Sequence, residues 1–188
     1  EALAEEELDI DTESVLDLGL SSLRPARELR WHYRSRHHSL IEFSNREFYR
    51  DRLIVFPSPY PPRGHLGVQL VEVGDGIYGA SVNIPEAEAV SNTVRDLIRG
   101  NPQASIGVVA VNQPQKEHLT ELFDRLFAEN DDLEAYRAKW AGTLEPFFIK
   151  NLENVQGDER DVIVISTVYG RSAVGGPVYQ RFGPINSK

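Results

Sequence analysis

Two unbroken apolar runs constrain the fold of this chain more than any other feature. Residues 106–111 read Ile-Gly-Val-Val-Ala-Val, and residues 161–168 read Asp-Val-Ile-Val-Ile-Ser-Thr-Val. The first run is typical of a strand buried on both faces of a parallel sheet, and the second is the strongest strand signal in the chain. Segments with helical periodicity alternate with these runs. The sequence therefore predicts an α/β sandwich with a mostly parallel central sheet.

The remaining elements follow from periodicity, capping residues and prolines. Ser14 can cap a first helix, while Pro85 stands where a later helix begins and Gly100 where it ends. Four prolines within residues 57–64 predict a loop, and the glycine-rich residues 74–79 predict a turn. Helices are predicted over residues 14–20, 39–50, 85–100, 119–127 and 131–140, and further strands near residues 27–33, 66–73 and 147–149.

Length and composition bound the class of protein. A chain of 188 residues with 40% apolar residues fits one domain with a substantial core, predicted over residues 14–188. The absence of Cys excludes a disulfide scaffold and thiolate metal sites. No apolar run has the length of a membrane span, and the first residues lack the order of a signal peptide, so a cytoplasmic location is expected. The absence of Met suggests an excised fragment.

The net charge of −9 comes from one end of the chain. Residues 1–17 hold eight acidic residues and no Lys or Arg, and the rest of the chain has 21 acids against 20 bases. Residues 1–13 are therefore expected to form an acidic lead that is solvated and partly disordered. Because nucleic acids bind to a local basic face, the overall acidity does not exclude such a partner.

Two polar clusters lie beside the predicted elements. Residues 31–37 read Trp-His-Tyr-Arg-Ser-Arg-His just before a predicted helix, and residues 154–161 read Asn-Val-Gln-Gly-Asp-Glu-Arg-Asp just before the second apolar run. Taken singly, each favours a solvated turn. Trp31 and Phe43 are expected to lie in the core. The three His residues near Arg34 favour ordinary hydrogen bonding over a metal site, since no carboxylate has ligand-like spacing.

The order and spacing of these clusters resemble the second RecA-like domain of a superfamily 1 helicase, on the branch related to Upf1 and Dna2. That family carries Gln-Tyr-Arg-Met-His-Pro ahead of a helix and a Phe-Tyr-x-x-x-Leu segment, matched here by residues 32–37 and 48–53. Its later motif, Phe-Gln-Gly-x-Glu-x-Asp ahead of an apolar strand, is matched by residues 155–161. The resemblance implies a RecA-like three-layer sandwich of the P-loop NTPase type.

The resemblance also implies roles for individual residues. Arg34 is expected to contact the γ-phosphate of ATP, as its fork of donors suits a phosphate oxygen. Tyr33 is expected to stack on the base, and Glu159 to accept a ribose hydroxyl. Gly157 lets the backbone pass close to the nucleotide. The two remaining residues of the second motif are expected to contact or couple to the nucleic-acid strand: Asn154 and Gln156.

The sequence departs from the family's motifs in three places. His32 replaces a Gln, and residues 35–38 replace Met-His-Pro. Where the family often has Thr-Pro-Tyr-x-x-Gln after the first apolar run, residues 110–115 keep only the final Gln115. There is no Gly-x-x-x-x-Gly-Lys-Ser/Thr loop for phosphates and no later Arg-rich motif. The isolated chain is therefore expected to lack ATPase activity.

The function expected on this basis is the second motor domain of an ATP-dependent DNA or RNA helicase or translocase. Its cofactors are ATP and Mg²⁺, with Mg²⁺ held mostly by the first RecA-like domain of the same polypeptide. Its partners are that domain and single-stranded DNA or RNA, with no membrane. The alternatives are a metal-dependent nuclease using Asp158, Glu159 and Asp161, or a non-catalytic α/β interaction module whose acidic N-terminus binds a basic partner.

Overall fold

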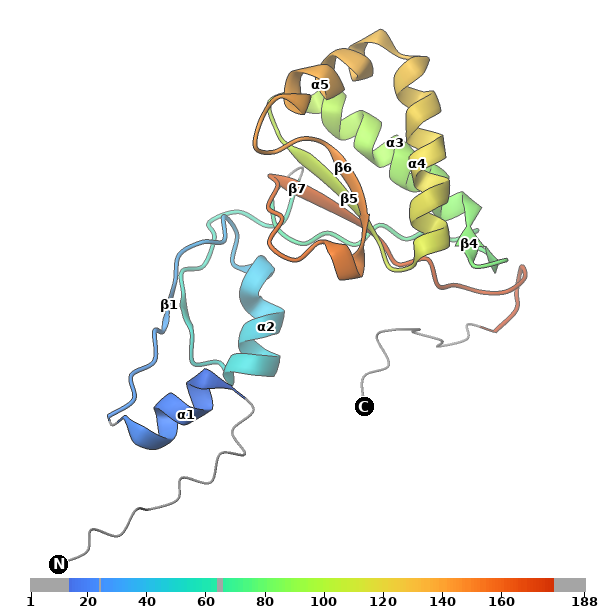
Figure 1. Ribbon diagram of the computed structural model, residues 1–188. Helices are drawn as coiled ribbons and strands as arrows, with labels where there is room; N and C mark the ends of the chain where they lie inside the picture. The colour runs from blue at the N-terminus through green and yellow to red at the C-terminus, as the bar shows by residue number, and fades with distance from the viewer. Residues whose placement is uncertain (1–13, 24, 64–65, 178–188) are drawn as a thin grey trace, which may run out of the picture. The chain divides into compact units, whose positions relative to one another are not determined.

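The computed structural model describes residues 14–23, 25–63 and 66–177, and it divides the chain into two compact units, residues 1–59 and 60–188 (Figure 1). We call them the first and the second unit. The acidic lead predicted for residues 1–13 lies outside the described residues. The single domain predicted over residues 14–188 stays a prediction. Among the described residues, no helix combines the length and the apolar character needed to cross a membrane.

The first unit contains a small parallel β-α-β motif. Strand β1 (Trp31–His32) pairs in parallel with β2 (Ile54–Val55), and helix α2 (Ser39–Tyr49) connects them. Helix α2 ends where Arg50 adopts a left-handed conformation with φ 54°. Helix α1 (Val15–Ser22) precedes the motif, and the structure confirms both helices predicted in this part of the chain.

The apolar side chains of the first unit lie mostly at its surface. Trp31 is 62% exposed and Phe43 is 60% exposed, so the prediction that these two residues belong to the core is wrong. Trp31 contacts the Phe56 ring at a centroid distance of 5.4 Å, and Phe43 contacts Phe48 edge-on at 6.2 Å. Strands of two residues and two short helices enclose too little volume to bury rings of this size.

The second unit is built on a three-stranded parallel sheet with the strand order β6-β5-β7. The central strand β5 (Ile106–Ala110) pairs with β6 (Phe148–Asn151) on one side and with β7 (Val162–Ser166) on the other. All five residues of β5 are buried, as its unbroken apolar pattern predicts. The predicted α/β fold with a parallel sheet is confirmed.

Three helices cover one face of this sheet (Figure 1). They are α3 (Ile84–Gly100), α4 (Gln113–Ala128) and α5 (Asp131–Ala141). Helix α4 begins earlier than the predicted residue 119 because Asn112 caps it, accepting a 2.9 Å hydrogen bond from the Gln115 N–H. The apolar periodicity does not extend into this first turn, so the sequence pattern missed it.

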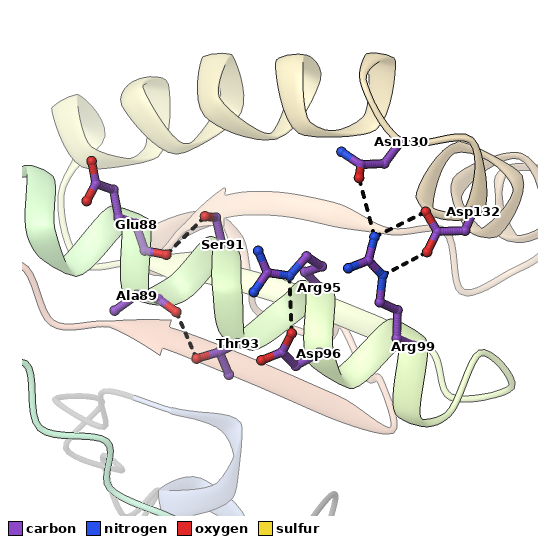
Figure 2. Close-up of polar contacts among 9 residues, drawn as sticks. All are labelled: Glu88, Ala89, Ser91, Thr93, Arg95, Asp96, Arg99, Asn130 and Asp132. Carbon is purple, nitrogen blue, oxygen red and sulfur yellow. Dashed lines mark hydrogen bonds and ion pairs between the residues drawn. The ribbon is translucent and has the colours of Figure 1, made fainter.

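An ion pair joins the end of α3 to the start of α5 (Figure 2). The Arg99 Nε donates to Asp132 at 2.8 Å, and its Nη2 donates to Asp132 and Asn130 at 3.4 and 3.3 Å. The hydrogen bond from Arg99 lowers the pKa of Asp132. Since both side chains are exposed, this contact contributes little to stability.

The stretch between the prolines and α3 differs from the prediction. The predicted strand over residues 66–73 is wrong, because in this described stretch the structure has only an isolated bridge between Arg63 and Leu66. Its alternating residues find no partner strand, and Leu70 is 85% exposed. A short hairpin follows instead, in which β3 (Tyr78–Gly79) pairs with the antiparallel β4 (Val82–Asn83).

Tyr136 provides a pH-dependent test of the core. It is 3% exposed, its hydroxyl donates to the Ala104 carbonyl at 2.9 Å, and burial raises its pKa to about 12. Because the folded state holds this proton more tightly, the stability that it contributes is complete below pH ~10 and is lost as the pH rises toward ~12. We expect urea denaturation to show this fall, at most about 3 kcal/mol, and expect Tyr136→Phe to remove the part that Tyr136 contributes.

Candidate functional site

The first motif forms a tight turn in the first unit. The His32 Nε2 lies 2.6 Å from the Ser35 hydroxyl and accepts a 3.3 Å hydrogen bond from the Ser35 N–H. These contacts close the turn around Tyr33 and Arg34, and both of those side chains are exposed. His32 stands where the helicase family that the sequence resembles has Gln. It therefore shapes the turn in which Tyr33 and Arg34 are exposed.

The two following histidines connect this turn to α2. His37 is 1% exposed, its Nδ1 lies 2.8 Å from the Ser39 hydroxyl, and its ring stacks on His38 at 4.5 Å. His38 binds Ser58 twice, through its N–H to the hydroxyl at 3.2 Å and through its Nδ1 from the N–H at 3.1 Å. The predicted hydrogen-bonding role of these histidines is confirmed, and the residues that replace Met-His-Pro hold the turn in place.

The second motif follows the carboxyl end of β6. A short 3₁₀ helix, η1 (Leu152–Asn154), comes first, and the Asn151 side chain caps it by accepting from the Asn154 N–H at 3.2 Å. The chain then turns at Gly157, which has φ 87°. An added Cβ at this position meets no atom within 4 Å. Glycine is therefore required here for its backbone conformation and not for space.

Alternate side chains of the second motif attach it to β6. Asp158 forms a 2.6 Å ion pair with Lys150, and the Arg160 guanidinium donates to the Pro146 carbonyl at 3.0 and 2.8 Å. Both cations also lie over the Phe148 ring, Lys150 at 5.1 Å and Arg160 at 4.7 Å from its centroid. Asp158 and Arg160 thus hold the loop against the sheet.

The residues expected to meet ligand lie between and before these attachments. Gln156, Gly157 and Glu159 are exposed, and so is Asn154 at the end of η1. The structure therefore brings these four residues together in one exposed, attached loop of the second unit. Tyr33 and Arg34 belong to the first unit, and the common nucleotide site predicted for both loops stays a prediction.

The acidic residues proposed for a nuclease bind separate partners. Asp158 pairs with Lys150, whereas Asp161 accepts from the Ser105 N–H at 2.9 Å near the amino end of β5. Among residues 14–23, 25–63 and 66–177, the structure has no group of three or more side chains placed to hold a metal ion. The contacts of Asp158 and Asp161 thus give the nuclease alternative no support.

A buried polar network lies where β5 and β7 end, and the sequence patterns did not reveal it. Gln115, the one residue matched in its family motif, is fully buried. Its amide donates to the Asn83 carbonyl at 3.1 Å and the Ser166 hydroxyl at 3.2 Å, and its Oε1 accepts from the Asn83 N–H at 2.8 Å. Glu86 completes the network by accepting from the Ser166 hydroxyl at 3.0 Å.

This network surrounds a strained residue. Val168 is fully buried and has φ 70°, a conformation that is an outlier for a β-branched residue. Its N–H donates to Glu86 at 3.0 Å, and its carbonyl accepts from the Asn83 amide at 3.0 Å. Such backbone strain costs about 1–3 kcal/mol, and strained residues of this kind concentrate at functional sites. Ligands of open α/β sheets also bind at the carboxyl ends of the strands.

Comparison with known proteins identifies the class of this chain. Residues 68–179 match the model of the AAA domain family, and the chain belongs to that family. Its parallel α/β sheet is accordingly that of an AAA or RecA-like domain of the P-loop NTPase type. The match covers β5, β6, β7, the second motif and the buried network.

Two curated relatives carry helicase names. The chain is 32% identical over 185 residues to an uncharacterized ATP-dependent helicase of Mycoplasma genitalium, and 33% identical over 163 residues to its homologue in Mycoplasma pneumoniae. These alignments cover 97% and 85% of this chain but 16% and 14% of the relatives, so the chain spans about one sixth to one seventh of their length. No solved structure matches the chain.

Proposed function

We propose that this chain is the second RecA-like motor domain of an ATP-dependent helicase or translocase, in superfamily 1 on the branch related to Upf1 and Dna2. It acts in the cytoplasm on single-stranded DNA or RNA, together with the first RecA-like domain of its polypeptide. Membership in the AAA domain family and the helicase names of the two Mycoplasma proteins support this proposal.

The observation that carries the proposal is the form of the second motif. Its backbone turns at Gly157 in a conformation that favours glycine, and Asp158 and Arg160 tie it to β6. Glu159 lies between these attachments and is exposed. A loop fixed in this way can offer a carboxylate to a ribose hydroxyl without first being ordered by the ligand.

In the proposed site, each of the two loops binds a different part of ATP. Arg34 contacts the γ-phosphate and stabilises the charge that develops on it during phosphoryl transfer. Tyr33 stacks on the base, and Glu159 binds the ribose. Gln156 and Asn154 link this loop to the nucleic-acid strand. Mg²⁺ would be held mostly by the first RecA-like domain and would offset charge on the phosphates, while Arg34, Tyr33 and Glu159 of this chain orient the nucleotide.

The proposal predicts different rates of ATP turnover for the 188-residue chain and for the helicase that includes it. The 188-residue chain alone is expected to show no ATP turnover above background, because the phosphate-cradling loop belongs to the partner domain. The helicase that includes it is expected to hydrolyse ATP faster when poly(dT) or poly(U) is added. A coupled phosphate-release assay measures both. Robust turnover by the chain alone, or a helicase that ignores single strands, would contradict the proposal.

A further inference from the structure

A γ-turn with an unusual backbone reverses the chain directly after β7. The Tyr169 N–H donates to the Thr167 carbonyl at 2.7 Å, and Val168 stands at the centre of this turn with φ 70°. A γ-turn with positive φ is the rare and strained form. A valine does not hold this conformation unless its surroundings impose it.

Helix α3 imposes it through the residues of its first turn. Asn83 caps α3 by accepting from the Glu86 N–H at 3.2 Å. In a capping box, the Glu side chain at this position would return to the N–H of the capping residue. Here the Gln115 Oε1 accepts from the Asn83 N–H. The Glu86 carboxylate accepts from the Val168 N–H instead. Asn83 holds the Val168 carbonyl, so both backbone groups of the strained residue are bound.

The reversed segment then packs against the β3–β4 hairpin. The Tyr169 ring lies 5.3 Å from the Tyr78 ring, and the Tyr78 N–H donates to the Arg171 carbonyl at 2.8 Å. A Cβ added at Gly170 would lie 3.5 Å from the Gly76 carbonyl oxygen, in ordinary van der Waals contact with the chain just before the hairpin. The turn at Val168 thus directs residues 169–171 toward the hairpin.

We propose that Glu86 is a positioning residue for the segment 167–171: it holds Val168 in the strained turn and so fixes the position of this segment at the carboxyl edge of the sheet. The inference rests on the proposed function for its role in the motor, where a fixed segment at this edge lets single-stranded nucleic acid stimulate ATP turnover. Gln115 supports Glu86 by accepting from the Asn83 N–H, the donor to which a capping-box carboxylate would otherwise bind.

The first test uses amide hydrogen exchange in the 188-residue chain. Glu86→Ala removes the acceptor of the Val168 N–H, so exchange at Val168 and Tyr169 is expected to accelerate by roughly 10-fold to 100-fold while exchange within β5 stays as in the wild type. Glu88→Ala, on an exposed residue of the same helix, is the matched control and should leave all of these amides unchanged. Unchanged exchange at Val168, or equal acceleration throughout β5, would overturn the positioning role.

The second test asks whether Glu86→Ala acts by releasing the strained turn at Val168 or only by removing a carboxylate. Val168→Gly lets the turn adopt its left-handed backbone without strain, so it should rescue Glu86→Ala in part. In the helicase that includes this chain, Glu86→Ala is expected to raise the poly(dT) concentration for half-maximal ATPase stimulation by about 10-fold, with less change in the maximal rate. The double variant should recover at least half of that shift on a logarithmic scale.

The outcomes of the two tests are distinguishable. A double variant that behaves like Glu86→Ala alone would overturn the proposal, because strain at Val168 would then play no part. A wild-type helicase that poly(dT) does not stimulate would contradict the proposed function. In that case, hydrogen exchange at Val168 would still decide whether Glu86 holds the turn.

Discussion

Arg34→Ala is expected to lower the rate of ATP hydrolysis by the intact helicase by about 10³-fold or more, the effect of removing an arginine that stabilises the transferring phosphoryl group. The loss should fall on kcat, with a smaller change in KM for ATP, because the charge on the γ-phosphate grows in the transition state. Steady-state phosphate release with saturating poly(dT) measures both parameters.

Two variants control this result. Arg36→Ala removes a second exposed arginine from the same segment, two residues away, and is expected to change kcat by less than about threefold, since no nucleotide contact is proposed for it. Arg34→Lys keeps the positive charge but loses the fork of donors, so it should recover little of the activity. If Arg34→Ala retains turnover near that of Arg36→Ala, Arg34 does not contact the γ-phosphate.

Phe123→Ala is expected to destabilise the second unit by about 3–5 kcal/mol, a large part of the total stability of a domain. Phe123 is 1% exposed and belongs to an aromatic cluster under the sheet, with its ring 5.9 Å from Phe127 and 5.5 Å from Phe147. Removing the Phe123 ring leaves a cavity between α4 and β6, and the surrounding side chains cannot move far enough to fill this cavity.

Trp140 offers a reporter for this measurement. It packs on the same core, and Trp31→Phe leaves it as the only Trp of the chain. Urea denaturation followed by Trp140 fluorescence in that background should show a clearly lower midpoint for Phe123→Ala. Leu144→Ala removes a side chain that is 99% exposed and should leave the midpoint unchanged. A shift for Phe123→Ala below about 1 kcal/mol would contradict the described packing.

The sheet of the second unit was predictable because its strands carry a complete local signal. The run at residues 106–111 is apolar throughout and the run at 161–168 has four consecutive apolar residues at its centre, and the structure places them in β5 and β7 within one or two residues. The strand predicted at residues 66–73 failed for the opposite reason. Its alternation is also a local signal, but a strand needs a partner, and the sequence does not show whether one is available.

The candidate site likewise has a part that the sequence predicted and a part that it did not. Gly157 was predictable because a glycine beside polar residues marks a turn, and its φ of 87° agrees. The Glu86 network was not predictable, since Glu86, Gln115 and Val168 are far apart in the sequence and each fits an ordinary helix or strand. Their roles arise from tertiary hydrogen bonds that no periodicity records. The histidines of the first motif similarly acquire their role only through Ser35, Ser39 and Ser58.

The most direct measurement is a structure of the helicase with a non-hydrolysable ATP analogue and Mg²⁺ bound. The account predicts an Arg34 nitrogen within about 3 Å of a γ-phosphate oxygen and a Glu159 oxygen at the same distance from a ribose hydroxyl of that nucleotide. An ATP analogue that Arg34 contacts while Glu159 lies on another face of the protein, or the reverse, would contradict it.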